Sequence, residues 1–307
     1  MPTYDGESYV GAALESVRAE AADDVEVVIV DDGSKDRTLE VVRRYEGALR
    51  LRLVPHQRVG NWVATTNAGL RAATGRFAAF LHQDDLWLPG RLAALRRAAA
   101  ERPEARLLFH PAIYVGPGGE RLGPWGCPLR RGWVAGDVLL EHLLVQNFIA
   151  IPSPIFDRAA ALAGGGLDEA LWYTADWDLW LRLGAGGAVY LDRPLAAFRV
   201  HAGSQTMSRR RSDEEFLGQM TTVLDRHLPG WRAAAGRRER VERVARFSAE
   251  VNAALSAAAR EGRGAPLRGL AGRFAALGPT GWLRYLRDSR ILERSWPRWR
   301  MQRAASG

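Results

Sequence analysis

Phe77-Ala-Ala-Phe-Leu-His-Gln-Asp-Asp-Leu-Trp87 is an apolar run that ends at two adjacent carboxylates, Asp84 and Asp85. A run of about four to eight apolar residues predicts a buried strand. Side chains that follow such a strand lie at the open edge of an α/β sheet, where these folds bind ligands. Two close carboxylates repel each other, so a divalent cation that bridges to substrate phosphates is a natural partner. The alternative is that the pair only opens a turn or caps the helix expected near Pro89.

Strand and helix patterns alternate around this stretch. Residues 25–30 are a strand candidate that ends at the turn Asp31-Asp-Gly-Ser-Lys-Asp36, and residues 38–45 resume a helical period. The order of strand, acidic Gly turn and helix is the unit of a doubly wound sheet. Further strands are expected at 49–54, 77–81, 106–114, 149–156, 188–191 and 195–200, and further helices at 8–19, 61–73, 92–100, 137–144 and 174–183.

The expected fold class is therefore α/β: a mixed, mostly parallel sheet flanked by helices. Residues 115–133 are rich in Gly and Pro, which favours an irregular segment that faces the substrate. From about residue 213 onward the apolar spacing is purely helical. We expect a helical C-terminal extension there.

Composition limits the class of protein. The chain has 307 residues, of which 47% are hydrophobic and 25% charged, as in ordinary globular proteins. The single cysteine, Cys127, excludes an internal disulfide framework and fits a reducing compartment. We find neither a secretory leader pattern nor an uninterrupted apolar stretch of about 18 residues. A cytoplasmic location is therefore expected.

Charge is unevenly distributed. Residues 231–307 hold 17 Arg against 6 acidic residues, whereas the first 230 residues hold 26 basic and 29 acidic ones. A nucleic-acid binder more often carries its basic surface on the folded body, so nucleic acid is not an expected partner. Two interpretations of the basic extension stay open. It packs on the body with a solvated basic face, or it docks on an anionic membrane.

Six motifs, taken in order, resemble those of the family 2 glycosyltransferases, enzymes with the GT-A fold. They are Pro2-Thr-Tyr-Asp5, Val30-Asp-Asp-Gly-Ser-Lys-Asp-Arg-Thr38, Asn67-Ala-Gly-Leu-Arg-Ala-Ala-Thr-Gly75, Phe80-Leu-His-Gln-Asp-Asp-Leu-Trp-Leu-Pro89, Asp176-Trp-Asp-Leu-Trp-Leu-Arg182 and Phe198-Arg-Val-His-Ala-Gly-Ser204. The resemblance covers roughly residues 1–206. It implies a GT-A, Rossmann-like glycosyltransferase domain in residues 1–212, followed by a helical, Arg-rich extension in residues 213–307.

The resemblance also implies where the nucleoside of a nucleotide-sugar donor binds. A carboxylate can accept hydrogen bonds from the imide N–H of uracil or from ribose hydroxyls. The alternative for Asp31 and Asp32 is a purely turn-forming role before Gly33. The implied nucleoside-binding residues are Pro2, Tyr4, Glu7, Asp31 and Asp32, with Asp84 in contact with the ribose or the sugar.

Asp84 and Asp85 match the metal motif of the family, with Asp85 as the expected direct ligand of Mg²⁺ or Mn²⁺. Such a cation offsets the charge that develops on the departing diphosphate. His201 stands where relatives place a histidine that completes the metal or diphosphate site, although a lone histidine is often structural. His82 stands where many relatives have Asp, and we expect it to be a local structural or hydrogen-bonding residue.

Asp176 matches the catalytic base of the family, although Ala175 replaces the Glu that often precedes it. A base must reach the acceptor hydroxyl and accept its proton as attack proceeds, and a single displacement inverts the anomeric carbon. Asp178 would face another side of the same helix. The alternative role for Asp176 is to cap the N-terminus of that helix.

The implied function is an inverting, metal-dependent hexosyl- or deoxyhexosyltransferase that acts on a hydroxyl acceptor. The implied setting is bacterial cell-surface polysaccharide or glycolipid synthesis. The basic extension would bring the enzyme to a lipid-linked acceptor at the inner membrane face. Two rival functions stay open. One is a catalytically silent nucleotide-sugar-binding or scaffold protein, and the other is a nucleotidyltransferase, which would release pyrophosphate.

The beginning of the chain departs from the family pattern. Relatives have a buried apolar strand immediately before Pro-Thr-Tyr, whereas Met1 stands here where that strand would end. A sheet that lacks this strand would leave backbone groups unpaired, and each such group is costly. We therefore expect a form extended at the N-terminus to be more soluble and more active.

Overall fold

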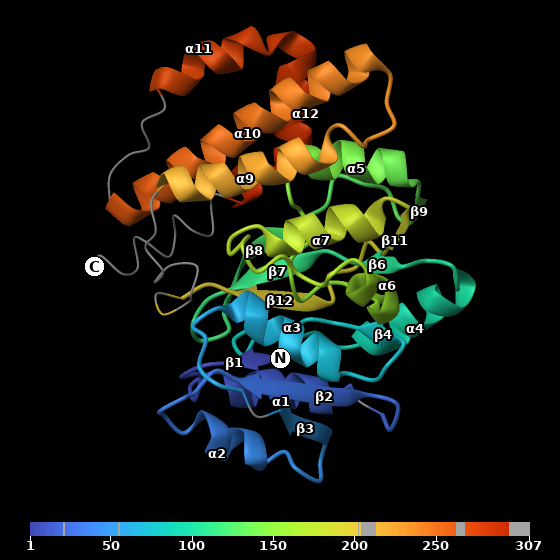
Figure 1. The fold of residues 1–307 in the computed structure, drawn as a ribbon, viewed down its shortest axis with the longest axis vertical. Helices are drawn as coiled ribbons and strands as arrows, with labels where there is room; N and C mark the ends of the chain where they lie inside the picture. The colour runs from blue at the N-terminus through green and yellow to red at the C-terminus, as the bar shows by residue number, and fades with distance from the viewer. Residues whose placement is uncertain (21, 55, 202, 204–212, 262–267, 295–307) are drawn as a thin grey trace.

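The first sheet forms the end of the molecule that lies at the bottom of Figure 1. The computed structural model describes residues 1–20, 22–54, 56–201, 203, 213–261 and 268–294. Within it β1 (Pro2–Thr3), β2 (Glu26–Asp31) and β3 (Arg50–Val54) pair in parallel, in the order β1-β2-β3. Residues 27–30 of β2 are all apolar and buried, as expected for a strand with neighbours on both sides.

Three helices accompany this sheet: α1 (Val10–Arg18), α2 (Thr38–Arg43) and α3 (Trp62–Ala72). The first strand was expected to be incomplete, and it is present as two paired residues. The α-amine of Met1 donates to the Val28 carbonyl at 2.7 Å, and the Met1 carbonyl accepts from the Val30 N–H at 3.0 Å. Backbone pairing with β2 therefore extends to the first residue of the chain.

Two further sheets form the middle of the molecule. One contains β4 (Phe77–Ala78), β10 (Ile155–Asp157), β6 (Leu107–Phe109), β11 (Ala188–Tyr190) and β9 (Gly132–Val134), in that order. The other contains β5 (Leu86–Trp87), β12 (Ala196–Arg199), β7 (Ala112–Val115) and β8 (Arg121–Trp125). Most pairings in these two sheets are antiparallel, so the expected parallel arrangement prevails only in the first sheet.

Several segments differ from the sequence prediction. The strand expected at 149–156 begins only at Ile155, in β10, because Pro152 and Pro154 lack the N–H that pairing needs. The strand expected at 106–114 divides at His110-Pro111 into β6 and β7, which lie in different sheets; proline lacks the N–H that a continuous strand would need. The segment 115–133, expected to be irregular, contains β8 and β9. Gly119, with φ of +89°, turns the chain between β7 and β8. Pro124 is tolerated in β8 because that strand lies at the edge of its sheet.

The remaining helices of the body are α4 (Arg91–Glu101), α5 (Gly136–Val145), α6 (Arg158–Ala163) and α7 (Ala175–Gly184). Four helices of the extension form the layer at the top of Figure 1: α9 (Asp213–His227), α10 (Ala235–Glu261), α11 (Arg268–Ala276) and α12 (Gly278–Ser289). They bury Val241, Val244 and Phe247 in a core shared with α5 and α7. The proposed domain boundary at residue 212, and Trp296 and Trp299, lie outside the described residues.

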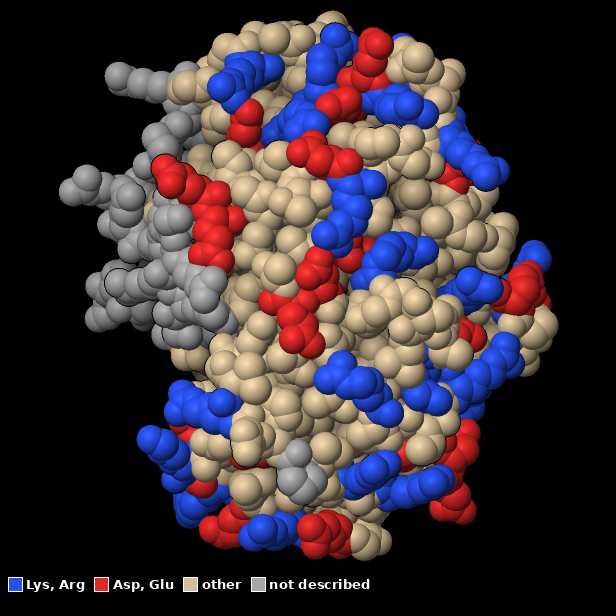
Figure 2. Space-filling model, in the orientation of Figure 1, with Lys and Arg blue, Asp and Glu red and all other residues tan. Residues whose placement is uncertain are grey.

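Several arginines in the described part of the extension are paired with acidic groups. Arg237 and Arg284 both bind Glu141 of α5, and Arg246 binds Asp225 at 2.7 Å. Figure 2 accordingly shows basic and acidic side chains interspersed over the top of the molecule rather than gathered in blocks of one sign. In the described part of the chain, no helix is both long enough and apolar enough to cross a membrane.

Candidate active site

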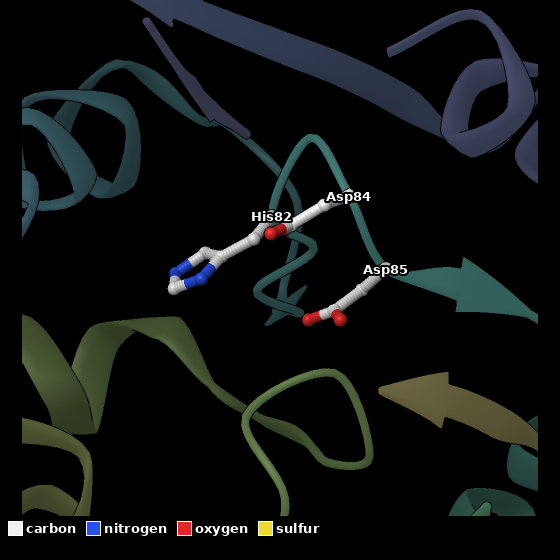
Figure 3. A group of neighbouring side chains, drawn as sticks. All are labelled: His82, Asp84 and Asp85. Carbon is white, nitrogen blue, oxygen red and sulfur yellow. The ribbon is translucent and has the colours of Figure 1, made fainter. Parts of the chain in front are cut away.

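The turn between β4 and β5 brings three candidate metal ligands together. The side chains of His82, Asp84 and Asp85 project toward one region (Figure 3), and one ligand atom of each lies within 4.8 Å of the others. The apolar run continues past β4 through buried Phe80 and Leu81, although ladder pairing stops at Ala78. The turn therefore begins in the core and ends at β5.

Asp84 lies on the more open side of this turn. Its Oδ2 is 3.0 Å from Nε2 of His201, which follows the end of β12. Burial alone would raise the pKa of Asp84, but the hydrogen bond from His201, together with nearby His82, lowers it below its ordinary value. The structure thus joins two predicted site residues that lie more than a hundred positions apart in the sequence.

Asp85 is buried, with an exposed fraction of 1%. Its Oδ1 accepts the backbone N–H of Arg199 at 3.0 Å, whereas its Oδ2 has no hydrogen-bond partner among the described residues. Burial, and then the charge of Asp84, raise the pKa of Asp85 well above its ordinary value. A cation at this position would counteract both effects.

His82 contacts Trp62 edge-on, with ring centroids 5.2 Å apart. Burial lowers the pKa of His82 to about 4, so the ring is neutral at pH 7. Its Nε2 is buried and lacks a partner among the described residues. The ring therefore packs on Trp62 beside the carboxylates, with this nitrogen unpaired among the described residues.

This cluster fits a divalent cation. A buried carboxylate oxygen and a buried imidazole nitrogen are each costly to leave unpaired, so the arrangement favours a ligand that satisfies both. Mg²⁺ prefers carboxylate oxygens, and Mn²⁺ also accepts imidazole. The residues that could hold the cation are His82, Asp84 and Asp85, with His201 against Asp84.

Asp31 and Asp32 follow β2, and both accept hydrogen bonds within the protein. Asp31 accepts from Thr3 Oγ1 at 2.8 Å and from the N–H and hydroxyl of Ser34 at 2.9 and 2.6 Å. Asp32 accepts the N–H groups of Val59 and Gly60 at 2.7 and 2.8 Å. The pair thus shapes the turn and ties it to the start of the chain and to the loop before α3.

Tyr4 lies beside the acidic turn. The amide of Gln83 accepts the Tyr4 N–H and donates to the Tyr4 carbonyl, both at 2.9 Å. The guanidinium of Arg58 lies over the Tyr4 ring, 4.4 Å from its centroid. A Cβ on Gly6 would lie 2.3 Å from the Gln83 side chain, so only glycine allows this approach.

The other two predicted nucleoside residues have simpler surroundings. Pro2 pairs in register with Val30 in β1, and exposed Glu7 accepts the N–H of Arg37 at 3.0 Å. The structure therefore gathers Pro2, Tyr4, Asp31 and Asp32 around the ends of β1 and β2. Glu7 stands at the outer edge of the same group.

Asp176 lies in the first turn of α7, as predicted. Its Oδ1 accepts the N–H of Trp177 at 2.8 Å, and its Oδ2 accepts from the side-chain amide of Asn147 at 3.0 Å. Burial raises the pKa of Asp176 to about 6, although these hydrogen bonds oppose the rise. A carboxyl with this pKa is mostly ionised at pH 7 yet still basic enough to accept a proton.

Asp178 faces away from that position, as predicted for a residue two places along a helix. It is fully buried and accepts from Arg182, Arg226 and His227 at 2.9, 2.8 and 2.9 Å. Burial alone would raise its pKa, but these three partners hold the pKa of Asp178 far below its ordinary value. Asp178 thus joins α7 to α9 and is not a candidate base.

Trp62 connects the acidic turn with the segment before α7. Its ring contacts His82, and its Nε1–H donates to the Trp172 carbonyl at 3.0 Å. Trp172 lies four residues before Asp176. The side chain at the start of α3 therefore packs against both halves of the candidate site.

Sequence reasoning missed Gln83, Asn147 and Arg199. Gln83 and Arg199 lie inside two of the six motifs, beside the candidate residues Asp84 and His201. Their positions could therefore have marked them as site residues. The Arg199 guanidinium donates to the backbone carbonyls of Asp84, Gly116 and Pro117 at 2.8 to 2.9 Å, which fixes the turn. Asn147 lies in no motif, and its contact with Asp176 could only be found in the structure.

Comparison with known proteins shows which family the N-terminal part of the chain is similar to in sequence. Residues 1–130 match the model of Glycosyl transferase family 2. An uncharacterized glycosyltransferase of Rickettsia prowazekii is 25% identical over 232 residues, which cover 70% of this chain and 67% of that protein. An uncharacterized protein of Mycobacterium tuberculosis is 29% identical over 260 residues, which cover 81% of this chain and 72% of that protein.

Solved structures show the same fold. TarS of Staphylococcus aureus, residues 1–349 in complex with UDP-GlcNAc, aligns with a TM-score of 0.66 at 19% identity, over 96% of this chain and 89% of that chain. The mannosyltransferase PcManGT of Pyrobaculum calidifontis, in complex with GDP-Man and Mn²⁺, aligns with a TM-score of 0.58 at 18% identity, over 96% and 84%. The chain therefore has the GT-A fold of these structures, and its residues 1–130 are similar in sequence to the family 2 glycosyltransferases.

Proposed function

We propose that this glycosyltransferase is an inverting, metal-dependent enzyme that moves a hexosyl or deoxyhexosyl group from a nucleotide-diphosphate sugar to a hydroxyl. The observation that carries the proposal is the cluster of His82, Asp84 and Asp85, with two unpaired buried ligand atoms. Bound Mg²⁺ or Mn²⁺ would supply positive charge that stabilises the departing diphosphate.

The residues around the acidic turn have distinct roles in this proposal. Asp84 and Asp85 hold the cation, His82 contributes its free nitrogen, and His201 orients Asp84. Arg199 keeps both carboxylates in place through the backbone contacts described above. Because Asp84 is more accessible than Asp85, we assign it the contact nearest the donor.

The nucleoside lies, in this proposal, over the ends of β1 and β2. Pro2, Tyr4 and Glu7 line one side of the place where the base binds, and the turn that carries Asp31 and Asp32 lines the other. The hydrogen bonds that these two carboxylates make within the protein keep the turn rigid before the donor arrives.

Asp176 is the proposed general base. It accepts the proton of the acceptor hydroxyl while the oxygen attacks the anomeric carbon. The bond from that carbon to the diphosphate breaks, and the nucleoside diphosphate leaves with the bonding electron pair. One displacement of this kind inverts the anomeric configuration. The contact of Trp62 with His82 and Trp172 supports a shared site, because it joins the donor side to the segment that leads into α7.

We propose a lipid-linked acceptor at the cytoplasmic face of the membrane, as in cell-surface polysaccharide or glycolipid synthesis. Three of the large apolar side chains that are most exposed, Leu283, Leu286 and Leu292, lie on α12 or just after it. A cavity of about 100 Å³ between α10 and α12 is lined by Arg240 and Arg243, and by Arg284, which also pairs with Glu141; the two other arginines could bind a phosphate headgroup. In Figure 1 the extension lies on the α7 side, away from β1 to β3.

A panel of nucleotide sugars tests the function. Donors that raise the melting temperature in the presence of Mn²⁺ are incubated with candidate alcohols, and the released product is identified. We expect free nucleoside diphosphate from the wild type and none from Asp176→Asn, which still binds donor. Release of pyrophosphate would indicate a nucleotidyltransferase. If the wild type and Asp176→Asn both bind donor but neither turns it over, the protein is a silent binding protein.

A further inference from the structure

We propose that Asn147 is a positioning residue for Asp176, and that α10 of the C-terminal extension holds Asn147 in place through Gln146. The inference rests on the role proposed above for Asp176. It makes the extension part of the catalytic apparatus rather than an appendage.

Asn147 is held at both ends of its amide. Its Nδ2 donates to Oδ2 of Asp176 at 3.0 Å, and its Oδ1 accepts the N–H of Ile149 at 3.2 Å. Because an amide has a donor side and an acceptor side, the second bond fixes the donor toward the carboxylate. Oδ1 of Asp176 is fixed by the Trp177 N–H, so the two contacts together set the plane of the carboxylate.

Gln146 connects this position to α10. The chain leaves α5 at Val145 and becomes extended at Gln146, whose backbone leads directly into Asn147. Its Oε1 accepts from the amide of Asn252 at 2.8 Å and from the hydroxyl of Ser248 at 3.2 Å, and its Nε2 donates to the Asn147 carbonyl at 3.3 Å. Asn252 in turn accepts from Arg294 at 3.0 Å.

Burial makes this network restrictive. Gln146, Ser248 and Asn252 are all less than 9% exposed. A buried amide that loses its partner has no water to replace it, so other orientations of Gln146 are costly. The extension therefore fixes the segment that presents Asn147 to Asp176.

The electrostatic consequence has a definite sign. A hydrogen bond donated to a carboxylate favours the ionised form, so the amide of Asn147 lowers the pKa of Asp176 and keeps the base ionised. Charged groups on elements packed against α7 have other partners. Asp178 pairs with Arg182, Arg226 and His227, Glu141 with Arg237 and Arg284, His142 with Asp288, and Arg158 with the Gly75 carbonyl.

The test follows the carboxyl resonance of Asp176 by ¹³C NMR as a function of pH, assigned by its absence in Asp176→Asn. We expect a midpoint near pH 6 in the wild type. Asn147→Asp keeps the shape but places a second carboxyl beside the first, so we expect the midpoint to rise by about one pH unit or more. Asn147→Ala removes the hydrogen-bond donor, so it should also raise the midpoint of the Asp176 titration.

Two further variants test the contribution of α10. Asn252→Leu removes the donor to Gln146, and we expect the midpoint to rise and kcat to fall with the KM for the donor unchanged. Gln219→Ala is the matched control, because it removes a buried amide of α9 that binds the Tyr173 N–H. It should lower the melting temperature without moving the midpoint.

The results separate the inference from the proposed function. An unchanged midpoint in Asn147→Asp and Asn147→Ala would overturn the role of Asn147. An unchanged midpoint in Asn252→Leu would overturn the role of α10. Full turnover by Asp176→Asn would instead overturn Asp176 as the base, whatever the NMR midpoints show.

Discussion

At the scale of single residues, the three aspartates Asp84, Asp85 and Asp176 have different affinities for protons. The pKa of Asp84 is lowered by His201, that of Asp85 is raised by burial, and that of Asp176 is raised to about 6. Groups whose surroundings separate their pKa values in this way are suited to different steps of one reaction. Metal binding and proton transfer are the steps we assign to them.

Asp84→Asn should weaken binding of Mn²⁺ together with a nucleoside diphosphate. The substitution removes the charge that faces His201 and the cation, so we expect a loss of about tenfold or more in affinity. Titration calorimetry with Mn²⁺ and UDP or GDP measures it. Asp23→Asn, at an exposed position, is the control and should bind as the wild type does. Equal affinity in the two variants would contradict the proposed metal site.

Asp176→Asn should stabilise the protein at high pH. The pKa of Asp176 in the folded state lies above the ordinary value, so folding favours the neutral form, and that stability is lost as pH rises through about 6. The asparagine avoids this loss. We expect a gain of about 1 to 3 kcal/mol at pH 8 that vanishes near pH 4, measured by urea unfolding. A difference that does not vary with pH would contradict the burial of this carboxyl.

The sequence predicted the places of these aspartates because each follows a strand or begins a helix. Asp31, Asp84 and Asp176 stand at such expected positions, and the resemblance of the ordered motifs singled them out. It could not reveal Asn147, because the contact with Asp176 joins two segments across the fold. It also could not show that Asp85 is more buried than Asp84, since adjacent residues share the same sequence context.

At the scale of elements, α7 is held from two directions. Its apolar face packs in the core, and Asp178 binds Arg226 and His227 of α9 on another side. A buried carboxylate with several partners differs from a surface ion pair, because its loss leaves charges without compensation. This clamp therefore contributes to the position of Asp176 two residues earlier.

Asp178→Asn should unfold more readily than the wild type. We expect a loss of about 2 to 4 kcal/mol, because Arg226 and His227 would lose a partially buried counter-charge. Urea denaturation followed by circular dichroism measures it. Glu15→Gln breaks an exposed pair with Arg18, which solvent screens, and should destabilise the protein far less. If both variants lost the same small amount, the clamp would not be important for stability.

Most helices and the strands of the first sheet agree with the sequence prediction, because their apolar periods are long and regular. The prediction failed where strands are short. β4 pairs over two residues although the apolar run continues, and β6 and β7 separate at His110-Pro111. β8 and β9 lie in a stretch whose Gly and Pro content masked their pairing. Which sheet a short strand joins depends on distant partners rather than on its own residues.

At the scale of the whole molecule, the extension combines paired arginines with exposed leucines. The sequence showed its net positive charge, but not that Glu141 of α5 would pair with two of its arginines, Arg237 and Arg284. The packing interpretation is confirmed for one face, whereas docking on a membrane stays a proposal for another. One face packs on α5 and α7, and the α12 face presents Leu283 and Leu286.

Anionic vesicles should bind the protein through the α12 face. We expect Leu283→Ser combined with Leu286→Ser to lower binding to phosphatidylglycerol vesicles by about tenfold, because apolar area no longer enters the interface. Cosedimentation measures it at low and high salt. Val59→Ser, which alters an exposed apolar residue at the nucleotide end, is the control. Absence of binding by the wild type at low salt would contradict the membrane proposal.

The arrangement of donor site and base is tested most directly by a crystal structure of Asp176→Asn with Mn²⁺ and an intact nucleotide sugar. Our account predicts the nucleoside over the ends of β1 and β2, and the ion and diphosphate beside Asp84 and His201. It places the anomeric carbon between that ion and residue 176. A donor bound elsewhere, or a sugar whose reacting face points away from residue 176, would contradict the account.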